Sequence, residues 1–152
     1  LHFIGAMPMY LALGLAPTLL GFALGLLVQG WLFEPADLLH WSVNTLSLAL
    51  PLLALHAGIG RKAQRIDLRS VLRLDTAYYA GVTAMVGFWL SIGDVATPLT
   101  DWLRFAASYG AVVVLEPILT IGVLLSLARV RHMPWVALCF DTRRVLRIAA
   151  AA

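Results

Sequence analysis

The sequence carries little charge, a single cysteine and none of the short motifs that mark soluble catalytic domains. Only 12% of its residues are charged, whereas about a quarter are charged in an average soluble domain. Cys139 has no second cysteine with which to form an internal disulfide. A phosphate-binding loop, a nucleophile elbow and a dinucleotide fingerprint are all absent, so the chain by itself is not expected to hydrolyse ATP. These absences weigh against a soluble enzyme.

Apolar residues are abundant instead: they make up 61% of the sequence, and the mean hydropathy is +0.88. Four apolar stretches are long enough, as helices, to cross the roughly 30 Å hydrocarbon core of a bilayer. They run over residues 17–33, 41–60, 74–92 and 105–128. Residues 1–15 form a fifth and shorter apolar segment, which we expect to be a short span or the remainder of a span that begins upstream. The predicted fold class is an all-α, polytopic transmembrane helical bundle.

Basic residues gather in two blocks. Five lie within residues 61–73 and five within residues 129–147, which leaves only Arg104 elsewhere. Lysine and arginine are retained on the cytoplasmic side of a membrane. We therefore expect residues 61–73 and the C-terminal tail, residues 129–152, to be cytoplasmic.

The alternation of spans then assigns the acidic connections, residues 34–40 and 93–101, to the outer side. Residues 1–128 form the transmembrane bundle in this scheme. The net charge of +3 is explained by the arginines that set the topology. We therefore expect the chain to contact membrane lipid rather than nucleic acid.

Glu116 is the least expected residue of the apolar spans, because it lies near the middle of residues 105–128 and precedes Pro117. An ionised carboxylate at the centre of a bilayer costs at least about 2.5 kcal/mol, so Glu116 must face protein or water, or be protonated. One interpretation is a carboxylate on a cation pathway. The other is a neutral or hydrogen-bonded acid that holds helices together, and we favour this structural interpretation.

Polar residues recur at helical spacing where the span 41–60 begins. Asp37, His40, Asn44 and Ser47 would share one face of a helix that starts early enough, and that face would descend from the outer surface into the bilayer. Gln29, at the end of the preceding span, could reach Asn44. The pattern is consistent with a polar pocket that opens outward. It is equally consistent with a helix cap followed by residues that bond neighbouring helices.

His2 lies near the same outer side in this topology, and imidazole is a good ligand for cobalt, nickel, copper and zinc. His2 and His40, with Asp37 nearby, could form a metal site. However, the sequence contains no compact His-x3-His or Cys-x2-Cys motif. Spacing alone therefore leaves metal binding as one hypothesis among others.

The stretch Leu26–Pro51, LLVQGWLFEPADLLHWSVNTLSLALP, resembles the membrane-embedded substrate-capture subunit of cobalt and nickel energy-coupling-factor transporters, the CbiM/NikM family. Gln29 matches a glutamine near the end of one family helix, and Asn44 matches an asparagine that opens the next helix. The segment from His2 to Gly25 resembles the family's histidine-containing approach to a glycine-rich helix. The resemblance is good over residues 1–56 and weak afterwards.

The resemblance implies a seven-span protein of the bacterial inner membrane, of which the five visible apolar segments would be the last five. Such subunits hold their metal mainly through nitrogen atoms, from an N-terminal Met-His segment and one further histidine. On this chain the further histidine would be His2, with Asn44 in support. The implied substrate is Co²⁺ or Ni²⁺, and no covalently bound cofactor is implied. The implied partners are a transmembrane coupling protein and ATPase subunits, supplied by other chains.

Two other functions are consistent with the same residues. The chain could be a non-catalytic accessory subunit of a larger membrane complex, because its spans carry packing motifs such as Gly21 and Gly25. The weakest alternative is an intramembrane enzyme that uses Glu116 with a histidine, since the outer histidines are predicted to lie far from that carboxylate. We therefore do not expect an enzyme.

Overall fold

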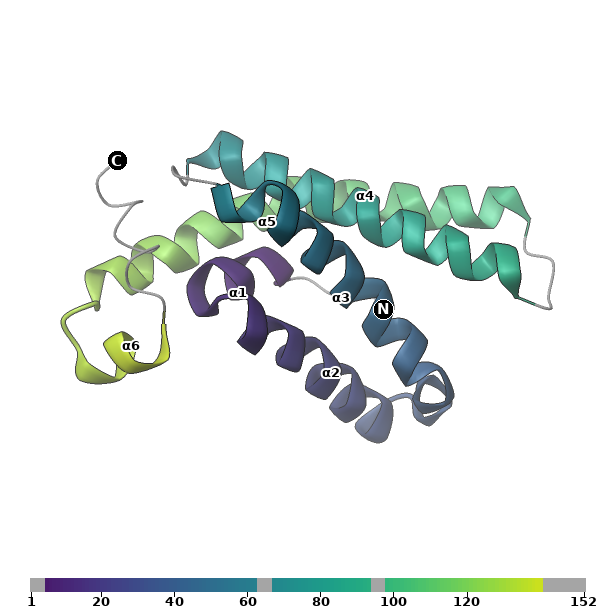
Figure 1. The fold of residues 1–152 in the computed structure, drawn as a ribbon, viewed down its shortest axis with the longest axis horizontal. Helices are drawn as coiled ribbons and strands as arrows, with labels where there is room; N and C mark the ends of the chain where they lie inside the picture. Colours follow the sequence, from purple (N-terminus) through teal and green to yellow (C-terminus); the bar gives the residue numbers. More distant parts are fainter. Residues whose placement is uncertain (1–4, 63–66, 94–97, 141–152) are drawn as a thin grey trace.

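A computed structural model describes residues 5–62, 67–93 and 98–140 of the chain. These residues form helices, connected by short turns, and contain no strand, which confirms the all-α prediction (Figure 1). The elements are α1 (Ala6–Leu13), α2 (Leu15–Leu32), η1 (Pro35–His40), α3 (Trp41–Gly58), η2 (Gly60–Lys62), α4 (Leu68–Ile92), α5 (Leu99–Arg129) and α6 (Pro134–Cys139). The two η elements are 3₁₀-helices.

Three of the described helical segments are long and apolar enough to cross a membrane. They are α2, the combined η1–α3 segment and α5. With 25 residues α4 is also long enough, but its first turns carry Arg69, Arg73 and Asp75. The chain is therefore a multi-pass membrane protein, and the crossing by α4 stays a prediction.

The long helices alternate in direction. The end of α2, the beginning of α3, the end of α4 and the beginning of α5 all lie toward one end of the bundle, on the right in Figure 1. The end of α3, the beginning of α4 and the end of α5 lie toward the other end. This arrangement matches the alternation on which the charge-based topology depends.

The first apolar segment folds differently from the others. Its described part contains only the eight-residue helix α1, which is about 12 Å long at the standard rise per residue. Gly14 follows with a φ of 91°, a conformation that favours glycine, and the chain turns there into α2. Because α1 covers less than half of a bilayer's hydrocarbon core, it does not cross the membrane by itself.

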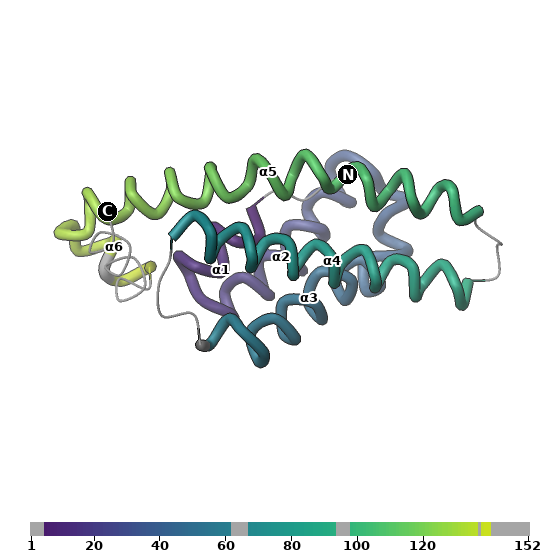
Figure 2. Tube along the Cα trace, turned by 90° about the horizontal axis from the view of Figure 1, so that it is seen from above, coloured from purple at the N-terminus to yellow at the C-terminus, as the bar shows by residue number. Residues whose placement is uncertain are grey.

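The core is formed by buried residues of α1, α3, α4 and α5, together with Phe22 of α2. Figure 2 shows α4 and α5 side by side along most of their length. Asp67 caps α4, since its carboxylate accepts a hydrogen bond from the Ser70 amide at 2.8 Å. The buried residues of α4 then recur every three or four positions, as one helix face requires.

Two hydrogen bonds from indole groups join neighbouring helices. The Trp41 indole of α3 donates to the Ala23 carbonyl of α2 at 2.8 Å, and the Trp102 indole of α5 donates to the Thr83 carbonyl of α4 at 3.1 Å.

Candidate functional site

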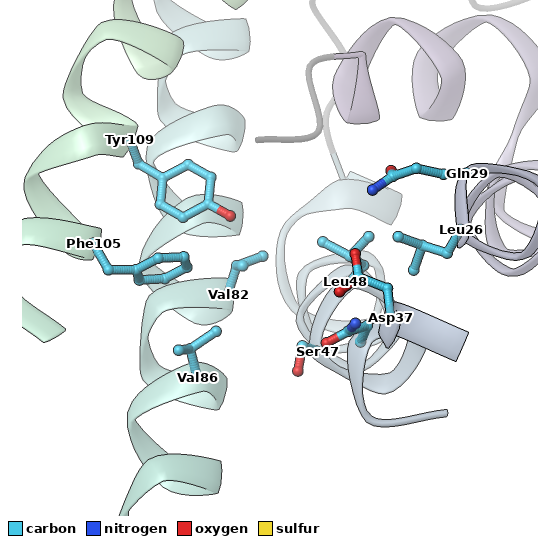
Figure 3. A pocket seen from close by; sticks show the side chains of 10 residues that line it. Leu26, Gln29, Asp37, Ser47, Leu48, Val82, Val86, Phe105 and Tyr109 are labelled. Carbon is cyan, nitrogen blue, oxygen red and sulfur yellow. The ribbon is translucent and has the colours of Figure 1, made fainter. Parts of the chain in front are cut away.

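A pocket of about 310 Å³ opens between α2, α3, α4 and α5, with η1 at its edge. One wall is polar and is formed by Gln29, Asp37, Asn44 and Ser47. The facing wall is formed by α4 and α5, through Val82, Val86, Phe105 and Tyr109, and the Tyr109 hydroxyl points across the pocket toward the Gln29 amide (Figure 3). The pocket thus combines hydrogen-bonding groups on one side with apolar and aromatic surface on the other.

Local structure explains how Asp37 reaches this pocket. Pro35 begins the 3₁₀-helix η1, and the Asp37 amide donates to the Glu34 carbonyl at 2.9 Å. Leu38 packs over Gly30, where a Cβ atom would lie only 2.7 Å from the leucine side chain. The close approach at Gly30 lets η1 fold back against the end of α2, so that Asp37 and Gln29 line the same cavity.

The sequence predicted that Asp37, His40, Asn44 and Ser47 share one face. Three of these residues line the pocket, but His40 is exposed and does not. The expectation assumed one continuous α-helix from Asp37 onward. In the structure the helix type changes at His40, whose φ of −107° and ψ of 12° leave the α-helical region, and the single stripe is interrupted there.

The pocket supplies oxygen and amide groups but no imidazole from the described residues. Within residues 5–62, 67–93 and 98–140 no group of three or more His, Cys, Asp or Glu side chains converges to hold a metal ion. His2, the histidine that the family resemblance selects, lies outside the described residues. His56 lies elsewhere, with its Nδ1 2.7 Å from the Tyr10 hydroxyl. Asp37 is therefore the only carboxylate of the described residues that lines this pocket.

A second polar region is enclosed where α1, α4 and α5 meet. Glu116 of α5 is fully buried. One of its carboxylate oxygens accepts a hydrogen bond from the Met7 amide, in the first turn of α1, at 2.8 Å. The other accepts a hydrogen bond from the Tyr79 hydroxyl of α4. Glu116 thus joins three helices.

Asp75 belongs to the same region and was missed by the sequence analysis. It lies at the beginning of the predicted span 74–92, where a carboxylate is easily taken for an interfacial residue. In the structure Asp75 is fully buried, one helical turn before Tyr79. The available signal was its spacing: Asp75 falls on the stripe that includes Val71, Tyr78 and Val82, so the pattern of α4 places it inside.

Several long apolar helices, a polar pocket near one end of the bundle and buried carboxyl groups define a polytopic membrane protein with polar side chains inside its bundle. A comparison with known protein families identifies the family to which the chain belongs. The family described as "cobalt uptake substrate-specific transmembrane region", CbiM, matches residues 1–134, and the chain belongs to this family. The chain is therefore a transmembrane component of cobalt uptake. No curated protein and no solved structure matches the chain significantly.

Proposed function

We propose that the chain is the substrate-capture membrane subunit of an energy-coupling-factor-type transporter that imports Co²⁺ or Ni²⁺. The observation that carries this proposal is the pocket that gathers Gln29, Asp37 and Asn44 near one end of the bundle. The match to a cobalt uptake family supports the substrate class. The chain lacks a nucleotide-binding motif, so ATPase subunits and a transmembrane coupling protein from other chains supply the energy.

In this proposal the protein lies in the bacterial plasma membrane, with residues 34–40 and 93–101 outside and with residues 61–73 and the C-terminus in the cytoplasm. Residues 1–128 form the transmembrane bundle, and residues 129–152 form a basic tail. The positive-inside rule supports this orientation. The pocket then faces the side from which an imported ion arrives.

Capture of the metal ion combines a charged oxygen with nitrogen ligands. The Asp37 carboxylate attracts the cation to the mouth of the pocket, and the amide oxygens of Gln29 and Asn44 orient it or its bound water. His2 is the proposed imidazole ligand, because nitrogen ligands favour Co²⁺ and Ni²⁺ over Mg²⁺ and Ca²⁺. The apolar wall formed by Val82, Val86 and Phe105 limits access of water to the bound ion.

Metal retention by purified full-length protein tests this proposal. We expect His2→Ala to lose bound Co²⁺ and Asp37→Asn to bind Co²⁺ on the order of tenfold more weakly in calorimetric titration, a difference of about 1.4 kcal/mol. Asp101→Asn is the matched control, because Asp101 is an exposed acid paired only with Arg104, at 3.6 Å. Unchanged Co²⁺ binding in His2→Ala and Asp37→Asn would overturn the proposal and favour an accessory subunit that binds no metal.

A further inference from the structure

Glu116 does not line the pocket, and its buried carboxylate has two specific hydrogen-bond partners on other helices. Both oxygens of the Glu116 carboxylate accept hydrogen bonds, from the Met7 amide and from the Tyr79 hydroxyl. An ionised carboxylate is only an acceptor, whereas a protonated one must also donate. Two donors directed at the two oxygens therefore match the ionised form of Glu116.

Asp75 presents the opposite case. Both of its oxygens are buried and have no hydrogen-bond partner among the described residues, and the same is true of the Thr120 hydroxyl. The helices α4 and α5 are antiparallel (Figure 1), and Tyr79 of α4 is bonded to Glu116 of α5. Asp75 lies one turn before Tyr79 in α4, and Thr120 lies one turn after Glu116 in α5. Because the two helices are antiparallel, Asp75 and Thr120 lie on the same side of the Tyr79–Glu116 bond.

Two buried carboxyl groups in one apolar region do not both ionise without a compensating cation. Asp75 lies one helical turn from Tyr79, whose hydroxyl bonds Glu116. The ion pair found among the described residues, Asp101 with Arg104, is exposed near the beginning of α5. Arg69 and Arg73 of α4 and Arg104 and Arg129 of α5 are exposed, so they do not neutralise a charge inside the bundle. The buried or half-buried titratable groups of the packed helices, besides the two carboxyls, are phenols and one imidazole. They are Tyr10 of α1, bonded to His56 of α3, Tyr78 and Tyr79 of α4, and Tyr109 of α5. None of the tyrosines supplies a positive charge, so like-charge repulsion and desolvation both favour one proton on the pair.

We propose that Asp75 and Glu116 form a buried proton-binding site that holds one proton, on Asp75, while Glu116 keeps its negative charge and fixes the first turn of α1. The protonated Asp75 carries no charge, so its burial without a hydrogen-bond partner among the described residues costs less than burial of the anion would. The charge on Glu116 strengthens its bond to the Met7 amide, because an anion is stabilised at a helix N-terminus.

Infrared spectroscopy of the full-length protein in lipid nanodiscs, without added metal, tests the site of the proton. At neutral pH the wild type should show the C=O stretching band of a protonated carboxyl that is shielded from hydrogen–deuterium exchange. Asp75→Asn should abolish this band, and Asp101→Asn should leave it unchanged. A wild type without the band, or a band that survives in Asp75→Asn and disappears in Glu116→Gln, would overturn the proposal.

Amide hydrogen exchange tests the connection to α1. In Glu116→Gln the amides of Ala6, Met7 and Met9 should exchange on the order of tenfold faster than in the wild type, because a charge-assisted bond is replaced by a neutral one. Amides in the middle of α2 serve as the internal reference, which also detects general unfolding. Unchanged exchange in α1 would contradict the fixing role of the Glu116 charge.

The same spectra distinguish a proton from a metal ion. Addition of Co²⁺, Mg²⁺ or Ca²⁺ at neutral pH should leave the protonated-carboxyl band in place. Loss of the band on addition of one of these ions would show that the pair binds a metal and would overturn the proposal. Because these measurements need no transport and no bound substrate, they are independent of whether His2 and Asp37 capture Co²⁺.

Discussion

The pocket between the long helices and the buried carboxyl groups Asp75 and Glu116 show two ways in which one apolar bundle accommodates polar side chains. In the pocket, Gln29, Asp37 and Asn44 are half-buried and share a cavity of about 310 Å³. Around the pair, Asp75 and Glu116 are fully buried, and Glu116 is bonded directly to two neighbouring helices. Polar groups that line a cavity remain available to bind a ligand. Polar groups that are fully buried away from a cavity can instead bond to neighbouring helices and stabilise the fold. The same type of substitution should therefore weaken ligand binding in one region and stability in the other.

The largest effect on stability is expected for Glu116→Ala. This substitution leaves the Met7 amide and the Tyr79 hydroxyl without their acceptor inside the bundle, and each buried unpaired donor costs about 1–3 kcal/mol. Thermal unfolding in detergent should show a strongly lowered midpoint. Glu116→Gln retains a carbonyl acceptor, so its unfolding midpoint should fall less than that of Glu116→Ala.

Glu34→Ala provides the control for this prediction, because Glu34 is an exposed acid in the turn after α2. Its midpoint should match that of the wild type. Equal midpoints for Glu116→Ala and Glu34→Ala would mean that the enclosed bonds contribute nothing to stability.

The next effect concerns the pocket and should appear in binding rather than in unfolding. Asn44→Ala removes an amide from the polar wall and should weaken Co²⁺ binding by about tenfold, which corresponds to about 1.4 kcal/mol. Because Asn44 is only half-buried, the change in unfolding free energy should stay within about 0.5 kcal/mol. Ser42→Ala, at an exposed position of the same helix, should change neither quantity. A lower free energy of unfolding in Asn44→Ala together with wild-type Co²⁺ binding would show that Asn44 serves stability rather than ligand binding.

A smaller effect is expected for Tyr10→Phe. The Tyr10 hydroxyl lies 2.7 Å from His56 Nδ1 and links α1 to α3. Such a bond contributes about 0.5–1.5 kcal/mol, less than the pair of bonds to the Glu116 carboxylate. Chemical or thermal unfolding of Tyr10→Phe and Glu116→Ala under the same conditions compares the two effects. A larger loss of stability in Tyr10→Phe than in Glu116→Ala would contradict the prediction.

The smallest effect is expected for Asp67, an exposed carboxylate outside the spans. Hydrogen bonds from Ser70 lower the pKa of Asp67 below its usual value of 3.8. A lowered pKa means that the ionised Asp67 stabilises the folded protein above pH 3.8 and that this contribution is lost as the pH falls through the folded-state pKa. In Asp67→Asn the cap is retained but does not titrate, so unfolding below pH 3.8 should show a slightly weaker pH dependence than in the wild type. An identical pH dependence of both proteins would contradict the role of this cap.

The sequence predicted the all-α fold. Three of its four long apolar stretches correspond to the helical segments that are long and apolar enough to span a membrane, α2, η1–α3 and α5. It also predicted that Asp37, Asn44 and Ser47 would come together, because helical spacing relates residues that are close along the chain. It did not predict that Met7 would contact Glu116, or that Asp75 would face α5 rather than the membrane surface. These contacts join residues far apart in the chain, and local periodicity carries no information about which helices become neighbours. The change of helix type at His40 was also missed, because a 3₁₀ turn after a proline differs little in sequence from the first turn of an α-helix.

The short helix α1 has a consequence for the order in which the protein is assembled. Its eight residues are too few to partition into lipid as an independent segment. The acceptor for its first-turn amide, Glu116, lies 109 residues later in the chain. During synthesis, α1 therefore leaves the ribosome well before α5 and cannot reach its final bonds until α5 has been inserted. We expect the helices that are inserted first to remain incompletely packed until α5 is inserted and α1 can bond to it.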